Sequence, residues 1–184
     1  MLCSFVYIVE GGDKLILKSD WPTDEEMKQT VSEYSSMLYK IAVVILCDPY
    51  DAEDVVQDTF LKFITKHPQF NDDNHKRAWL IRVAVNIAKD KKSYNLRHQH
   101  LDFDSLEDFL VCKDEYEDEL DIPILLELPV KYRRVLYLHY IEELSVNEIS
   151  EIEAITVFAV KHRLHHGRSL LKKLCEVKRI EEDK

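Results

Sequence analysis

One long apolar stripe constrains the fold of this chain more than any other feature. Its residues recur at alternating steps of four and three: Met27, Val31, Tyr34, Leu38, Ile41 and Ile45. That spacing places them on a single face of an α-helix. Thr23 and Glu26 precede the stripe at the spacing of a capping box, and Asp48-Pro49 follows it. We therefore predict an amphipathic helix that begins after Thr23 and ends before Asp48.

Composition and cysteine spacing limit the class of protein. The chain has 184 residues, of which 46% are hydrophobic, with only 3 Gly and 5 Pro, and this favours a helical globular protein over a disordered one. No apolar run is long enough to span a membrane, and the N-terminus lacks the plan of a signal peptide. The four cysteines include no CxxC pair, which argues against zinc and against a disulfide scaffold. We expect a cytoplasmic protein without metal or cofactor.

Capping residues and prolines in the sequence predict where further helices begin and end. Asp51 is expected to cap a second helix that runs to about His67, and a third is expected from about His75 to Ser93, after a polar loop. Later in the chain, Pro129 suits the first position of a helix over about 130–142. A capping box at 145–148 opens a short helix, a turn follows at 153–155, and a last helix reaches about residue 178.

The predicted fold is all-α, with two small helical domains joined by an acidic linker. The first domain covers 23–94, the linker 95–122, the second domain 123–178, and a short tail 179–184. Residues 1–22 carry a weak hairpin signal around Gly11-Gly12. They are expected to be either a hairpin or an extension from a start codon read too early, with Met27 as the alternative start.

Charge is distributed unevenly along the chain. The formal net charge is −10, which by itself speaks against nucleic acid. However, the segment 101–121 holds ten acidic residues and one basic residue, whereas 156–179 holds seven basic residues and one acidic residue. A basic C-terminal unit can bind phosphates, and the acidic segment should avoid them.

The C-terminal unit has the pattern of a helix-turn-helix, because a short capped helix, a tight turn and a longer capped helix follow one another. Its predicted core is Leu144, Ile149, Ile152, Ile155, Val160 and Leu164, and Val157 and Gly167 are expected on the inner side of the last helix. The outward face carries Phe158, Lys161, His162, His165 and Arg168, which would suit a DNA major groove. An ordinary amphipathic helix with solvated bases is the alternative. At the turn, Ala154 stands where glycine would cost less if φ is positive.

The third helix carries a polar row opposite its apolar face. Trp79, Arg82, Asn86 and Lys89 recur at steps of three and four residues. An aromatic ring, cations and an amide in one row suit unpaired bases and their phosphates. The alternative is a bundle helix with a buried Trp79 and a solvated polar face.

The second helix carries a row of acidic and amide side chains on its polar face. The row consists of Glu53, Asp54, Gln57 and Asp58, with Leu61 among them. Neither histidine nor cysteine lies three or four residues away to complete a metal site. A polar patch with one apolar residue and no catalytic partner suits a protein interface, and a solvated face is the alternative.

Three segments together resemble the bacterial RNA polymerase sigma factors of the small extracytoplasmic-function (ECF) type, in the sigma-70 family. DAEDVVQDTFLKF is similar to the helix that docks on the polymerase, and WLIRVAVNIAKD is similar to the helix that works on the −10 promoter element. The segment from LPVKYRRVLYLHY to VKHRLHHGRSLL is similar to the unit that reads the −35 element.

The resemblance implies a role for each segment. The row at 53–61 would bind the clamp helices of core RNA polymerase, the loop at 68–76 would capture a flipped −10 base, and the helix at 130–142 would face the polymerase flap. The acidic linker would thread toward the polymerase cleft, and an anti-sigma factor would be a further partner. Catalysis would remain with the polymerase. Phe158, Ala159 and His166 depart from the family pattern, so the −35 sequence that is read would be unusual.

Two other readings remain open at this point. A helix-turn-helix regulator would bind duplex DNA alone, as a dimer on a palindrome. A carboxylate-metal enzyme in a helical bundle would need Glu-x-x-His pairs on inward faces, and the sequence offers none.

Overall fold

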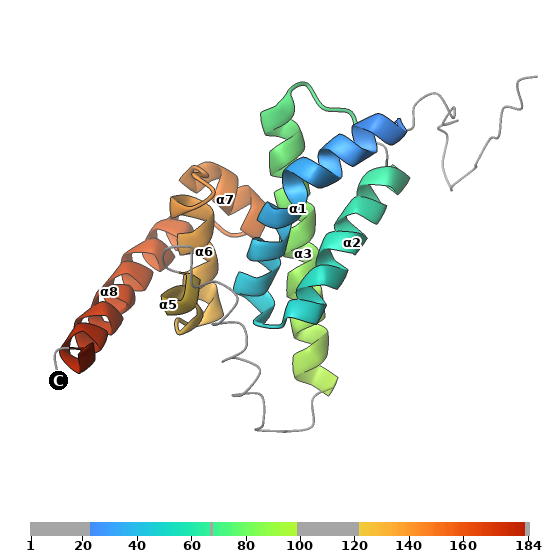
Figure 1. The fold of residues 1–184 in the computed structure, drawn as a ribbon. Coiled ribbons are helices and arrows are strands. Elements are labelled where there is room, and N and C mark those ends of the chain that lie inside the picture. Colours follow the sequence, from blue (N-terminus) through green and yellow to red (C-terminus); the bar gives the residue numbers. More distant parts are fainter. Residues whose placement is uncertain (1–22, 67, 99–121, 183–184) are drawn as a thin grey trace, which may run out of the picture.

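The computed structural model describes residues 23–66, 68–98 and 122–182, and within these ranges the regular structure is entirely α-helical (Figure 1). The helices are α1 (Asp24–Leu46), α2 (Pro49–Lys66), α3 (Asp73–His98), α5 (Ile122–Leu126), α6 (Val130–Tyr140), α7 (Val146–Glu153) and α8 (Val157–Glu182). We call α1–α3 the first unit and α5–α8 the second unit. The predicted all-α fold is confirmed. Residues 1–22, with the predicted hairpin, and 99–121, with most of the predicted linker, lie outside the described residues.

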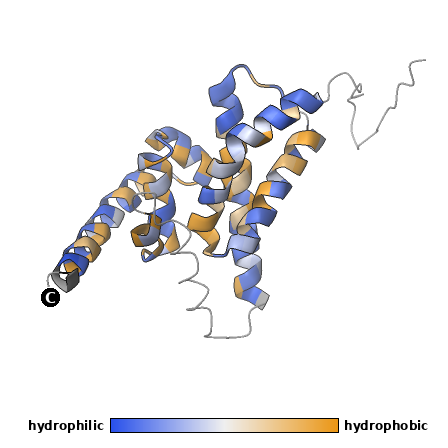
Figure 2. Ribbon diagram, viewed as in Figure 1, coloured by the Kyte–Doolittle hydropathy of each residue, from blue (hydrophilic) through white to orange (hydrophobic). Residues whose placement is uncertain are grey.

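The first unit buries the apolar stripe of α1 against α2 and α3. Leu38, Ile41 and Ile45 on α1 are each at most 1% exposed, and Val55 on α2 and Leu80 on α3 are fully buried in the same core. Figure 2 shows hydrophobic residues along these helices where they lie side by side. Val31 is 38% exposed, so the stripe is buried from Tyr34 onward only. Area removed from water is the main favourable contribution to this packing.

The start of α2 differs from the prediction. The sequence suggested Asp51 as the N-cap, but α2 begins at Pro49. The backbone N–H of Asp51 donates a 2.8 Å hydrogen bond to Oδ1 of Asp48. Asp48 is therefore the capping side chain. The reason is that proline fits the first helical position, where its missing N–H costs no hydrogen bond.

Two helices continue beyond their predicted ends. α3 runs to His98 and α8 to Glu182, so the helix ends predicted near Ser93 and residue 178 were placed too early. On α3, Ser93 Oγ donates to the carbonyl of Lys89, and Arg97 Nε donates to the carbonyl of Ser93. Neither glycine nor proline interrupts these last turns, so the backbone pattern persists.

The second unit contains the predicted helix-turn-helix, formed by α7 and α8. Most of its predicted core is buried, with exposures of 5% or less: Leu144, Ile149, Ile152, Val160 and Leu164, while Ile155 is partly buried. At Gly167, an added Cβ would lie 3.0 Å from Leu136 Cδ1, so the missing side chain lets α6 approach α8 closely. Val157 was predicted to face inward but is 36% exposed, because it is the first residue of α8 and no preceding turn covers it.

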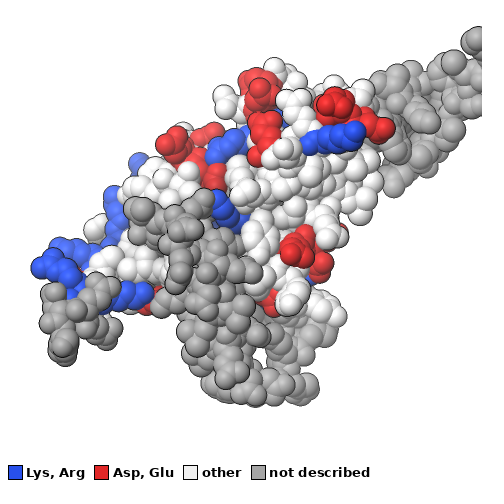
Figure 3. Space-filling model, viewed as in Figure 1, with Lys and Arg blue, Asp and Glu red and all other residues white. Residues whose placement is uncertain are grey.

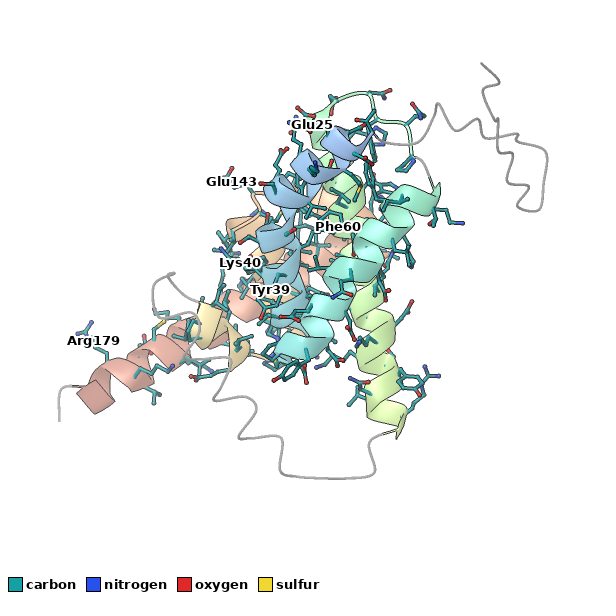
Figure 4. All side chains as sticks on the ribbon, turned by 45° about the vertical axis from the view of Figure 1, so that its right-hand side comes forward. Glu25, Tyr39, Lys40, Phe60, Glu143 and Arg179 are labelled. Carbon is teal, nitrogen blue, oxygen red and sulfur yellow. The ribbon has the colours of Figure 1, made fainter. Side chains whose placement is uncertain are left out.

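The two units pack directly against each other. α1 contacts α5 and α6, α3 contacts α7, and the buried apolar residues of both units form one cluster. Figure 1 shows α6 and α7 beside α1 and α3, with α8 extending away, and Figure 4 labels Lys40 and Glu143 on the two sides of this contact. The sequence predicts two domains joined by a linker, and the structure adds an interface between them.

Candidate protein and nucleic-acid interfaces

The polar row of α2 lies on the surface. Glu53, Asp54, Gln57 and Asp58 are exposed, and Leu61 is 57% exposed. The opposite face is buried, with Ala52, Val55, Thr59 and Phe63 in the first unit. Helical period alone therefore separates the two faces, and the first unit leaves the row free to contact another macromolecule.

Lys91 on α3 joins the row to the rest of the unit. Its Nζ lies 2.6 Å from Asp54 Oδ2 and 3.0 Å from Asp51 Oδ1, and Asn95 Nδ2 donates to Asp51 at 2.7 Å. Burial disfavours the charge on Lys91, but hydrogen bonds and attraction from both carboxylates outweigh it, so the pKa of Lys91 is raised. The side chain of Asp54 stays 61% exposed, which leaves the carboxylate accessible to a partner.

The head of α3 carries an aromatic cluster. The Phe63 and Phe70 rings stack with centroids 6.1 Å apart, and Trp79 meets both rings edge to face. Lys76 Nζ donates a 2.7 Å hydrogen bond to Thr30 Oγ1 and lies 5.4 Å from the Phe63 centroid. Trp79 is therefore half-buried in packing, as the alternative reading of the polar row anticipated.

The rest of the polar row on α3 meets the second unit. Arg82 and Asn86 are exposed and Lys89 is half-buried. Arg82 Nη2 lies 3.1 Å from Glu151 Oε2 on α7, and Lys89 Nζ donates to the carbonyl of Glu153 at 3.2 Å. The row thus lies on one face of α3, and two of its cations have partners on α7.

The outward face of α8 is open. Phe158 is 78% exposed, and Lys161, His162, His165 and Arg168 are also exposed. Arg168 Nη1 donates to the hydroxyl of Tyr140 at 3.3 Å. Figure 3 shows Lys and Arg gathered over the end of the molecule that α8 forms. Among the described residues, no group of three or more His, Cys, Asp or Glu side chains is arranged to hold a metal ion.

The second unit contains buried charged side chains that the sequence patterns did not predict. Glu153 has a fully buried side chain that pairs with Arg134 on α6 and lies 3.5 Å from Arg163 on α8. Arg133 is 5% exposed and points toward the first unit. One signal was available for Arg133: it lies between Val130 and Tyr137 at steps of three and four, on the apolar face of its helix.

Most of the apolar face of the helix at 130–142 is buried within the chain. The resemblance implied that this helix faces the polymerase flap, and that role stays a prediction; Val135, Leu136, Tyr137 and Leu138 on α6 are each at most 2% exposed. These side chains are covered because α6 packs between α1 and α8. The exposed apolar surface at this place is limited to Tyr140 and Ile141, at the end of the helix.

Both units match known protein families. The model of sigma-70 region 2 matches residues 30–98, which covers most of the first unit, and the model of sigma-70 region 4 matches 124–171, which covers most of the second. The chain is 31% identical over 159 residues to the ECF RNA polymerase sigma factor SigW of Bacillus subtilis (strain 168), covering 78% of the chain and 85% of SigW. The chain belongs to the ECF sigma factors.

Further relatives and solved structures agree with this membership. The ECF sigma factor SigM of Bacillus subtilis (strain 168) is 29% identical, across 77% of this sigma factor and 90% of SigM. The structure is similar to CnrH, solved in complex with the cytosolic domain of CnrY, with a TM-score of 0.60, 25% identity and coverage of 84% and 90% of the two chains. It shares its fold with the sigma factor RpoE of Bartonella quintana, solved in complex with the anti-sigma factor NepR, with a TM-score of 0.61, 21% identity and coverage of 83% and 98%.

Membership in this family gives the general function. The chain is a sigma factor that directs RNA polymerase to promoters and so takes part in transcription initiation. Within the described ranges, no helix combines the length and apolarity needed to cross a bilayer.

Proposed function

We propose that this sigma factor binds core RNA polymerase through the exposed row of α2. Asp54, Gln57 and Asp58, with Glu53 and Leu61 beside them, would contact the clamp helices. The observation that supports this most directly is the exposure of the whole row on a helix whose other face is fully used in packing. The row joins carboxylates and an amide with one exposed leucine, a combination that suits a protein interface.

Promoter recognition would be divided between the two units. Arg82, Asn86 and Lys89 would hold the opened −10 strand, and the loop at 68–76, next to Trp79, would accept a flipped base. On α8, Lys161, His162, His165 and Phe158 would face the bases and backbone of the −35 element. Arg168 would contact phosphate chiefly. Phosphate contacts would position the protein, and base contacts would specify the promoter.

The factor would work in the cytoplasm and would catalyse no reaction itself, because the polymerase supplies the chemistry. The match to CnrH and RpoE, both solved with regulatory partners, supports an anti-sigma factor as a further partner of this chain. The competing reading, a dimeric helix-turn-helix regulator, has no comparable support, since both units match sigma-70 regions.

Reconstitution with core polymerase tests the proposal. The purified chain is added to core enzyme, the stoichiometry of the complex is measured, and transcription from a pool of promoters is sequenced. We expect one copy per polymerase and initiation from a defined subset of promoters, with binding that weakens steeply with salt. A chain that binds a palindromic duplex as a dimer and ignores the polymerase would support the competing reading.

A further inference from the structure

Three histidines lie together on α8, on the face proposed to meet the −35 element. His162 and His166 are four residues apart, and the centroids of their rings are separated by 4.3 Å. The ring of His165 lies 5.7 Å from that of His166. All three side chains are exposed. We call these three residues the histidine cluster, and the described residues leave it open to a partner.

The charged neighbours of the histidine cluster along α8 are basic. Lys161 and Arg168 are exposed beside it, and Arg168 donates to the hydroxyl of Tyr140 at the end of α6. Arg163 lies 3.5 Å from the buried carboxylate of Glu153 on α7. Between residues 157 and 175 the sequence contains no acidic residue. The cluster is therefore set in a positive stretch of the helix.

The helices packed against α8 were searched for groups that face the cluster. From α6, the ring of Tyr132 lies 6.4 Å from that of His166, and Lys131 Nζ lies 4.9 Å from the centroid of the Tyr132 ring. In the turn after α5, Glu127 pairs with Lys178, near the far end of α8. The described parts of α5, α6 and α7 thus bring a phenol and an ammonium group toward the cluster, and the carboxylates that reach α8 have basic partners elsewhere on it.

The charge of such a patch depends on pH. A solvated histidine has an ordinary pKa of about 6.5, so it is mostly neutral at pH 8 and mostly cationic at pH 6. Protonation of all three rings would gather like charges among bases that are already present. Nearby negative charge favours the cationic form, and the phosphates of a DNA duplex supply it. Binding of DNA to this face and binding of protons are therefore expected to support each other.

We propose that the histidine cluster is a phosphate-binding site for duplex DNA that works in its protonated form, with His166 as an additional contact. This inference rests on the proposed function, because it takes the outward face of α8 as the DNA-binding face. At pH 6, imidazolium groups would join Lys161 and Arg168 on the DNA backbone. At pH 8 the two bases would act without them. DNA binding would thus take up protons, and the upstream promoter contact would strengthen as the pH falls.

The combined substitution His162→Gln, His165→Gln and His166→Gln tests the proposal. Binding of the full chain to a short fluorescein-labelled duplex of mixed sequence is measured by anisotropy at pH 8 and pH 6, with EDTA present to remove metal ions. We expect wild type to bind at least about tenfold more tightly at pH 6. Its slope of log affinity against log salt should be steeper there by about 2, from three rings that are each roughly three-quarters protonated. The triple variant should lose most of both differences.

The comparison at pH 8 is the matched control, because glutamine then replaces a mostly neutral ring and is compatible with a helix. Equal pH dependence in wild type and the triple variant would overturn the proposal. A triple variant that is weakened equally at both pH values would also overturn it, since the rings would then act without charge. Calorimetry in two buffers of different ionisation enthalpy counts the protons directly, and we expect uptake by wild type that falls in the variant.

A single substitution keeps the proposal testable if the triple variant does not fold. His166→Arg is charged at both pH values, so it should tighten DNA binding at pH 8 and reduce the gain on going to pH 6. Unchanged binding at pH 8 would remove His166 from the phosphate contacts. Failure of the proposed function is distinguishable: Lys161→Ala with Arg168→Ala would then leave duplex binding unchanged at both pH values.

Discussion

The guanidinium of Arg133 donates a hydrogen bond from Nε to the carbonyl oxygen of Val44, 89 residues earlier in the chain. Its remaining nitrogens reach the carbonyls of Ile45 and Leu126 and the thiol of Cys47. The last carbonyls of a helix lack partners within the helix and carry partial negative charge. Arg133 therefore caps α1 from the opposite unit. Burial, the largest influence on this side chain, lowers the pKa of Arg133 below its ordinary value.

Arg133→Met tests this capping role. The variant leaves buried carbonyls without a donor, so we expect the free energy of unfolding to fall by about 3 kcal/mol. Urea unfolding followed by circular dichroism provides the measurement. The control is Lys131→Met, an exposed position on the same helix, which should cost less than about 0.5 kcal/mol. Equal losses in the two variants would contradict the capping role.

Ala154→Gly is expected to stabilise the helix-turn-helix. Ala154 is the C-cap residue that follows α7. Its φ of 54° lies in the left-handed region, and its side chain is exposed. A Cβ costs about 1–2 kcal/mol there, and the added freedom of glycine in the unfolded chain offsets part of the gain. We expect a net increase of about 0.5–1 kcal/mol in the free energy of unfolding, measured in urea. A decrease would show that the alanine methyl makes contacts that outweigh the strain.

The capping box of α7 gives the stability a pH dependence. Ser145 and Glu148 exchange hydrogen bonds, and those to the carboxylate lower the pKa of Glu148. Because the pKa is lower in the folded state, the stabilisation is present above the ordinary glutamate pKa and is lost as pH falls through the lowered value. We expect Ser145→Ala to cost about 1 kcal/mol at pH 7. The difference from wild type should shrink in acid, which unfolding curves from pH 7 to pH 3 would show; a constant difference would contradict it.

Asp54→Ala with Gln57→Ala should abolish binding to core polymerase while the helical circular dichroism stays unchanged, because both side chains are exposed and outside the core. Pull-down with core enzyme provides the measurement. Lys91→Met is the matched control, since it breaks the same ion pair with Asp54 but keeps the carboxylate. Wild-type affinity for core polymerase in the double variant would show that the polar row of α2 is not part of the polymerase interface.

Lys161→Ala with Arg168→Ala should weaken binding of the holoenzyme to upstream promoter DNA and spare its assembly. The slope of log affinity against log salt should fall by about 0.9 for each lost phosphate contact. Lys172→Ala with Lys173→Ala, farther along α8, removes equal charge and should change the slope less. Loss of polymerase binding along with DNA binding would indicate misfolding instead.

Sequence patterns predicted the local structure best where apolar spacing and capping agree. Most of the predicted core of the helix-turn-helix is buried. The turn at Ala154 has the positive φ for which glycine would have cost less. Predicted ends were less accurate. The start of α2 was placed too late because Pro49 occupies its first position and Asp48 is the cap. The helices α3 and α8 run past their predicted ends because no glycine or proline stops them. The roles assigned to the exposed rows stay predictions, since exposure leaves open which partner covers them.

The sequence alone determined that this chain is helical, that its helices divide into two units, and which face of each helix is polar. Periodicity and caps are short-range properties, and neighbouring residues fix them. Only the tertiary structure decided that Arg133 ends α1 from the far unit and that Arg82 pairs with Glu151, 69 residues away. Such contacts depend on how two surfaces meet in space, and no local pattern encodes the partner of a buried or shared charge.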